Sequence, residues 1–136
     1  MKVICKRLKP GDELFSAIEK LVIEEHIQAG TLLSLVGSLS TATLRYAGKE
    51  EATVLEGPFE VVSATGVVAA AGSHLHLSLA DKNGTTLGGH FMSGNYVYTT
   101  IELVILDLSE QYSFKREFCP LSGYDELSVV AREEGN

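Results

Sequence analysis

Several residue types are scarce in this chain of 136 residues. It has no tryptophan, two cysteines and three prolines, and only 11 lysines and arginines against 18 aspartates and glutamates. The cysteines, Cys5 and Cys119, lack CxxC spacing, so they predict neither a zinc ribbon nor a dithiol redox site. The net charge of −7 argues against a large nucleic-acid surface, because such surfaces are usually basic.

Long apolar runs are absent as well. No stretch of 18 apolar residues is present, so the sequence predicts no transmembrane helix. Residues 1–7 carry scattered charges and lack the apolar segment of a secretion signal. We therefore expect a cytoplasmic protein that does not bind membranes, folded as one domain over residues 1–136.

One helix is predicted near the beginning of the chain and strands are predicted elsewhere. Apolar residues recur at helical spacing over residues 12–29, with Asp12 as the expected N-cap and Gly30 as the expected stop. About seven strands follow from alternation and turn signals, including an edge strand at 112–118 and two strands separated by Gly57-Pro58. The pattern predicts an α+β fold in which a largely antiparallel sheet is flanked by one main helix.

The segment from Gly72 to Gly94 has the clearest strand alternation. Leucines at 75, 77 and 79 alternate with His74 and His76, so the leucines share one face and the two histidines share the other. The segment holds three of the four histidines of the chain, the third being His90. It predicts a β-hairpin with one core face and one polar face.

The turn of this hairpin determines where His90 points. A two-residue type I′ turn at Asn83-Gly84 would place His90 opposite Leu77, on the core face. A three-residue loop with Gly84 in the left-handed conformation would place His90 opposite His76. We favour the second alternative, because it leaves the apolar residues of both strands on one face and a one-residue slip would reverse every side chain.

In that register His74, His76 and His90 form a candidate metal site. Opposed strand residues have Cβ atoms about 5 Å apart, close enough for three imidazoles to converge on one ion. Three histidines with an open fourth position suit zinc, and imidazole also binds other divalent transition metals such as Cu, Ni and Fe. The alternative is that the histidines are polar residues on a solvated or subunit-facing surface, or line a pocket for a non-metal ligand.

Glu102 is a second unusual residue, because it lies within an apolar strand where an unpaired charge would be costly. We expect it to pair with Arg45 or Lys115, or to orient one of the histidines by hydrogen bonding.

The sequence resembles the plants-and-prokaryotes conserved (PPC) domain family, in particular its stand-alone prokaryotic branch. The similarity lies in four segments, namely residues 57–66 (GPFEVVSATG), 72–81 (GSHLHLSLAD), 84–90 (GTTLGGH) and 97–102 (VYTTIE). The resemblance implies a seven-stranded antiparallel sheet with a flanking helix, a homotrimer, and the DNA-binding label of the plant members. It also implies a metal at His74, His76 and His90. The chain has no Arg-Gly-Arg-Pro AT-hook, the element that contacts DNA in those plant proteins.

Two functional hypotheses follow. The first is a stand-alone PPC-domain protein with a regulatory or DNA-associated role and a three-histidine site for a metal or small ligand. The second is a metal-dependent enzyme that acts through a metal-bound water. No P-loop, nucleophile elbow or dinucleotide-binding fingerprint indicates another chemistry.

Overall fold

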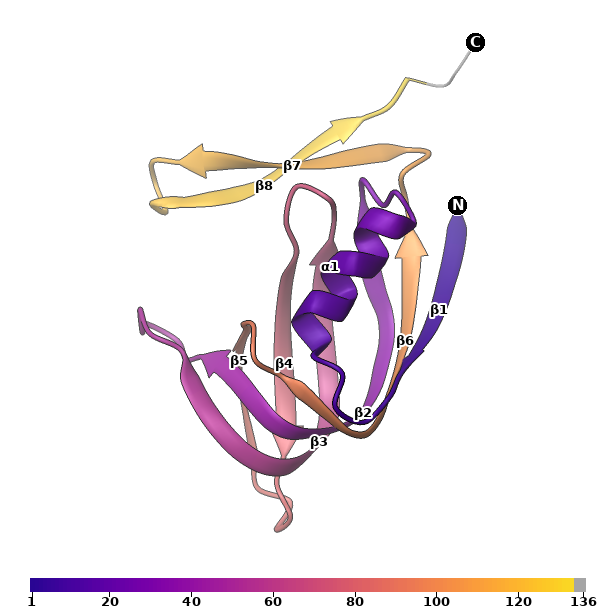
Figure 1. Cartoon of the computed structure of the whole chain (residues 1–136). Coiled ribbons are helices and arrows are strands. Elements are labelled where there is room, and N and C mark those ends of the chain that lie inside the picture. The colour runs from indigo at the N-terminus through magenta and orange to yellow at the C-terminus, as the bar shows by residue number, and fades with distance from the viewer. Residues whose placement is uncertain (134–136) are drawn as a thin grey trace.

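The computed structural model describes residues 1–133 and contains one helix and eight strands in that range. The elements are β1 (Lys2–Leu8), α1 (Leu14–Glu24), β2 (Gly30–Arg45), β3 (Thr53–Val68), β4 (His74–Ala80), β5 (Thr86–Phe91), β6 (Tyr96–Asp107), β7 (Tyr112–Cys119) and β8 (Tyr124–Ala131). Six strands form an antiparallel sheet in the order β1-β6-β2-β3-β4-β5, and β7 pairs with β8 in a second sheet (Figure 1). The predicted α+β class with a largely antiparallel sheet is confirmed, with eight strands in two sheets instead of about seven in one.

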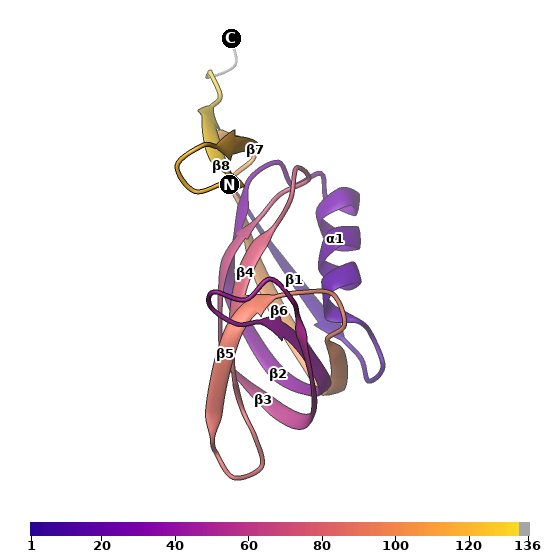
Figure 2. The ribbon, with the colours of Figure 1, turned by 90° about the vertical axis from the view of Figure 1, so that its left-hand side faces the viewer.

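The large sheet curls so that β2 contacts three neighbours. Along its 16 residues β2 pairs with β3 and β6, and its last residues pair with β5, where Arg45 lies opposite His90. Since β5 also pairs with β4, the strands β2 to β5 return on themselves (Figure 2). Gly37 allows β2 to approach β6 closely, because a Cβ atom there would lie 1.9 Å from the carbonyl oxygen of Thr100 on β6.

Strand β3 is continuous where the sequence predicted two strands. The prediction ended one strand at Gly57-Pro58, but β3 runs through this dipeptide to Val68. The partner strand β2 has an irregularity between Leu39 and Thr41 at this level, which accommodates the proline without ending the pairing. A Cβ atom at residue 57 would lie 2.7 Å from the Leu39 carbonyl oxygen, so a glycine is needed for this close approach.

Helix α1 is shorter than the predicted 12–29. Its N-cap is Glu13, whose carboxylate accepts hydrogen bonds from the backbone N–H groups of Phe15 and Ser16. The expected cap, Asp12, instead accepts a hydrogen bond from the backbone N–H of Lys9. The helix ends early because His26 adopts a left-handed conformation (φ 55°), which turns the chain before Gly30 enters β2.

The core lies between α1 and the inner face of the large sheet. Leu14 and Ile18 of α1 are buried, and β4 contributes three buried leucines to the same cluster. Burying each such side chain contributes about 2 kcal/mol to folding. In the described part of the chain, no helix has the length and apolar character needed to span a membrane.

Strands β7 and β8 form a hairpin, called the arm below (residues 112–131), that extends from the body formed by α1 and the large sheet (Figure 1). The strand predicted at 112–118 is present as β7, but it pairs with β8 in a separate two-stranded sheet and not with the main sheet. The sequence did not predict β8. One backbone hydrogen bond from the N–H of Phe114 to the carbonyl of Gln28 (2.9 Å) ties the arm to the body. Since isolated hairpins are marginally stable, the arm depends on such contacts.

Candidate metal centre

The turn between β4 and β5 has the three-residue geometry favoured by the sequence. Asp81 donates its backbone N–H to the Thr85 carbonyl and accepts a hydrogen bond from the Gly84 N–H, both at 2.9 Å. Gly84 is left-handed (φ 78°), and the Asp81 carboxylate accepts from the backbone N–H groups of Asn83 and Thr85. The consequence is the predicted register, in which His76 lies directly opposite His90.

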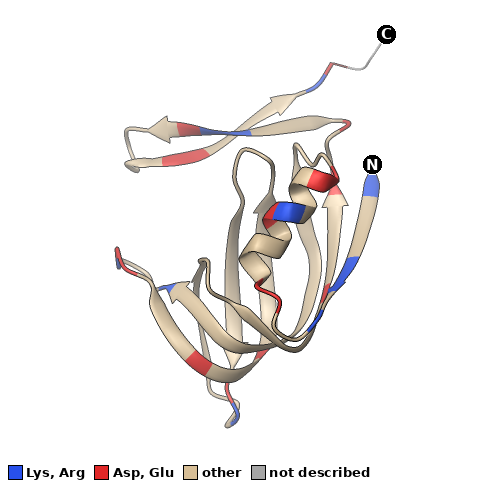
Figure 3. Ribbon diagram, in the orientation of Figure 1, with Lys and Arg blue, Asp and Glu red and all other residues tan. Residues whose placement is uncertain are grey.

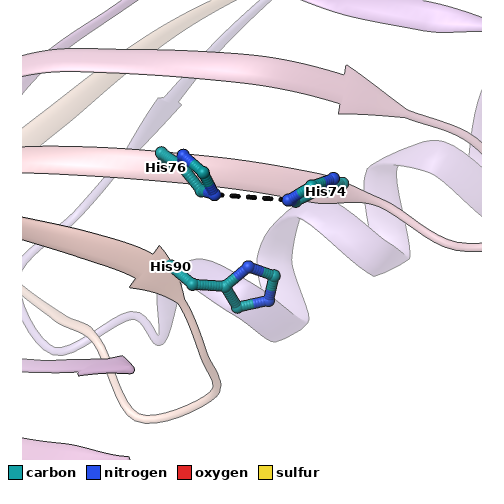
Figure 4. Close-up of side chains that lie close together, drawn as sticks. All are labelled: His74, His76 and His90. Carbon is teal, nitrogen blue, oxygen red and sulfur yellow. Dashed lines mark hydrogen bonds between the residues drawn. The ribbon is translucent and has the colours of Figure 1, made fainter. Parts of the chain in front are cut away.

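The three histidine side chains converge on the outer face of the sheet (Figure 4). The ring centroids are 5.0 Å apart for His74 and His76, 5.1 Å for His74 and His90, and 5.7 Å for His76 and His90. One ligating nitrogen from each ring can be chosen so that all three lie within 4.8 Å of one another.

The closest pair of nitrogens fits a metal site. The Nε2 atoms of His74 and His76 are 3.3 Å apart. With metal–nitrogen bonds of about 2.0–2.1 Å, tetrahedral geometry places two ligand nitrogens about 3.3 Å apart. His90 supplies the third nitrogen of the set. The donor set is therefore suited to zinc or another divalent transition metal.

The electrostatic surroundings keep two of these imidazoles neutral, which is the form that binds metals. Desolvation by burial lowers the pKa of His74, and the charges of His76 and Arg116 add to the effect. Burial also lowers the pKa of His90, followed by the charge of Arg45. Near pH 7 the nitrogen lone pairs of both rings are therefore available to a cation.

The glycines beside His90 allow the backbones of the two neighbouring strands to approach β5 closely. A Cβ atom on Gly88 would lie 2.7 Å from the Leu77 carbonyl oxygen, and one on Gly89 would lie 2.8 Å from the Arg45 carbonyl oxygen. These two glycines therefore allow β5 to lie between β4 and the end of β2. This packing brings Arg45 next to His90.

A pocket of about 970 Å³ opens over the histidines. Its walls come from the end of β2 and the following loop, from β4 and β5, and from the arm. The arm contributes Arg116, Tyr124, Asp125 and Glu126. Sequence reasoning missed these four residues. The alternation of 112–118 did not indicate that Arg116 lies near the histidines, and no strand was predicted at 124–131.

Glu102 does not lie in this pocket, and the expectation that it is a buried charge is wrong. It is exposed on β6, opposite Arg7 of β1 and Val36 of β2. Val36 is nine residues along β2 from Arg45, the residue that pairs with His90. At about 3.3 Å per residue, this separation is roughly 30 Å of strand length. Among the described residues no hydrogen bond joins Glu102 to a histidine. Glu102 forms no ion pair with Arg45 or Lys115 within residues 1–133.

Comparison with known families assigns most of the body to a protein family. The family model for the Plants and Prokaryotes Conserved (PCC) domain, the family designated PPC above, matches residues 1–109. This range includes the three histidines and Arg45 and ends before the arm. A relative, the "Bifunctional protein GlmU" of Synechococcus sp. (strain JA-3-3Ab), is 42% identical over 129 residues, which cover 95% of this chain. The chain spans about a fifth (21%) of the length of that relative.

Two solved structures have the same fold. The hypothetical protein from Salmonella cholerae-suis is 43% identical, with a TM-score of 0.94 and coverage of 97% of this chain and 95% of that one. The "metal-containing protein AF0104" from Archaeoglobus fulgidus is 28% identical, with a TM-score of 0.82 and coverage of 94% of both chains. Both alignments extend over nearly the whole chain, beyond the range that the family model matches.

Proposed function

Because the chain belongs to the Plants and Prokaryotes Conserved domain family, we propose that it is a metal-binding member whose function resides in the His74, His76 and His90 cluster. The observation that carries the proposal is the convergence of one ring nitrogen from each of His74, His76 and His90 within 4.8 Å of one another, with the Nε2 atoms of His74 and His76 3.3 Å apart. The Archaeoglobus relative, a metal-containing protein of the same fold, supports it.

Zinc is the ion that we propose first, since three imidazoles leave a fourth tetrahedral position open. An ion at this site would polarise an oxygen bound at the open position and lower the pKa of a bound water. The three rings lie on the wall of the pocket, so that position would face a space that a small molecule can enter. This arrangement is the observation that favours the alternative function, a metal-dependent enzyme.

Elemental analysis of protein purified without an affinity tag tests the metal proposal. We expect stoichiometric zinc or another divalent transition metal in the wild type, and its loss in His76→Ala and His90→Ala. His26→Asn is the matched control, because His26 lies at the end of α1, outside the cluster, and asparagine tolerates its left-handed conformation. Metal-free wild type after zinc loading, or full occupancy in both alanine variants, would refute the proposal.

We also propose that the protein is a homotrimer, as the family resemblance implies. The outer face of the large sheet supports self-association, since it exposes about half of the surface of several apolar side chains, including Leu33, Val36 and Val62. Analytical ultracentrifugation would report a mass three times that of the chain. A monomer across the accessible concentration range would refute this proposal.

DNA binding remains a prediction of the resemblance. Among residues 1–133, β1 carries basic residues alone, with Lys2 separated from Lys6 and Arg7 by three uncharged residues, and no helix or strand there carries a continuous basic stripe (Figure 3). Together with the net charge of −7, this pattern favours the metal site as the seat of function. Electrostatic binding is strongest at low salt, so failure to retard duplex DNA at low ionic strength would exclude a DNA-binding role for this chain alone.

A further inference from the structure

Arg116 of the arm carries a buried polar group without a partner. Its Nη2 atom is shielded from solvent and has no hydrogen-bond partner within the described residues. It also forms no ion pair among residues 1–133. Arg116 as a whole is half-buried. A buried N–H group is normally satisfied by a carboxylate, a phosphate or a backbone carbonyl, so the unpaired Nη2 indicates a missing acceptor.

The side chain lies beside the histidines. Arg116 lines the main pocket, and a second, smaller pocket on the same sheet face is lined by Arg116 together with His74 and His76. Its aliphatic carbons lie close to Gly72, just before β4, because a Cβ atom on Gly72 would lie 3.6 Å from Arg116 Cγ. The charge of Arg116 also contributes to the lowered pKa of His74, which agrees with its proximity.

A second arginine approaches from the opposite side. Arg45, at the end of β2, pairs with His90 and lines the same pocket. The histidines therefore lie between two guanidinium-bearing residues, one contributed by the body and one by the arm. Guanidinium groups present paired N–H donors that match the oxygens of carboxylates and phosphates.

The charges that line the pocket balance before a metal is counted. They are Arg45, Lys49 and Arg116 against Glu50, Asp125 and Glu126. A divalent ion on neutral imidazoles would leave an excess of about two positive charges in a water-accessible pocket. An anion would offset that excess and would supply the acceptor that Arg116 lacks.

We propose that this pocket binds a small oxyanion, a carboxylate or a phosphate, held by Arg116 and Arg45 beside the histidine cluster. The inference rests on the proposed metal site, because the charge of the ion would add to the anion affinity. The two arginines would bind an anion in the metal-free protein as well. Arg45 lies within residues 1–109, whereas Arg116 lies in the arm, so one of the two anion-binding arginines comes from outside the segment that the family model matches.

Isothermal titration of the full-length protein with inorganic phosphate and with acetate tests the proposal, in zinc-loaded and in metal-free samples. The test variant is Arg116→Met. Its matched control is Lys115→Met, which removes the same charge from the adjacent, exposed residue of β7. We expect Arg116→Met to weaken anion binding by about tenfold or more while the zinc content stays stoichiometric, and Lys115→Met to bind as the wild type does. The preferred probe identifies the ligand as a phosphate or a carboxylate.

Three outcomes separate this inference from the metal proposal. If zinc does not bind but the metal-free protein binds an anion through Arg116, the metal proposal fails and the anion site stands. If zinc binds and neither anion binds, the anion site is refuted. Equal anion affinity in the wild type and in Arg116→Met also refutes it. Arg45→Met is the second variant, and it must weaken anion binding as well. Unchanged urea unfolding of Arg45→Met checks that this variant is folded.

Discussion

The two faces of the β4–β5 hairpin differ sharply in exposure and chemistry. On the inner face Leu75, Leu77 and Leu79 are exposed by only 2%, 3% and 0%. On the outer face, one residue away along the same strand, His74 and His76 are exposed and converge with His90. The inner face stabilises the fold, whereas the outer face provides ligating atoms that the fold does not require. Substitutions on the two faces should therefore have separable effects.

The largest effect is expected on the inner face. Leu79→Ala removes a fully buried side chain from the centre of the core and should lower the free energy of unfolding by about 2–5 kcal/mol, through lost burial and the cavity left behind. Urea denaturation of the metal-free protein measures it. Thr86→Ala, at an exposed position of the same hairpin, is the control and should change stability by less than about 0.5 kcal/mol. A loss below about 1 kcal/mol for Leu79→Ala would contradict the claim that the inner face of the hairpin stabilises the fold.

His76→Ala should leave the stability of the metal-free protein within about 0.5 kcal/mol of the wild type, because the side chain is exposed. The same change should abolish the stabilisation that zinc confers on the wild type. At a free zinc concentration 100 times the dissociation constant, that stabilisation is about 2.7 kcal/mol. Urea unfolding with and without zinc measures both quantities. Equal stabilisation of variant and wild type would place the ion elsewhere.

The histidine cluster was predictable because two local rules act on a short segment. Alternation assigns leucines and histidines of β4 to opposite faces, and the Asp81–Gly84 turn determines the register of β5. Neither rule depends on distant parts of the chain. The overall α+β class followed for the same reason, from periodicity within each segment.

The features that were missed have different causes, some local and some between segments far apart in the sequence. The helix N-cap shifted by one residue because Asp12 satisfies the Lys9 N–H instead. Arg116 reaches the pocket only because β7 pairs with β8 and not with the main sheet. Glu102 was misjudged because apolar neighbours in sequence indicate a buried strand, while its own side chain lies on the exposed face of β6.

A smaller effect is expected farther out on the outer face. Val62→Glu places a charge on the exposed apolar surface that we propose to be buried between protomers, and it should weaken self-association by about tenfold or more. Sedimentation equilibrium measures the change. Ile23→Glu, at an exposed apolar position on the helix side of the sheet, is the matched control and should leave the mass unchanged. The opposite result would assign the interface to the helix side.

The smallest effect is expected at Glu102. Glu102→Gln should leave the zinc content unchanged and alter the free energy of unfolding by less than about 0.5 kcal/mol, because the carboxylate is exposed and lies far along the sheet from the histidines. Elemental analysis and urea unfolding measure the two quantities. A marked loss of zinc would show that Glu102 supports the site after all.

An anomalous-difference map would locate the ion itself. Crystals of the untagged protein, soaked in zinc and measured above the zinc absorption edge, should show a strong peak about 2.0–2.1 Å from a ring nitrogen of each of His74, His76 and His90. Absence of a peak between the three rings, or a peak coordinated by other residues alone, would contradict the assignment of this histidine cluster as the metal centre of the protein.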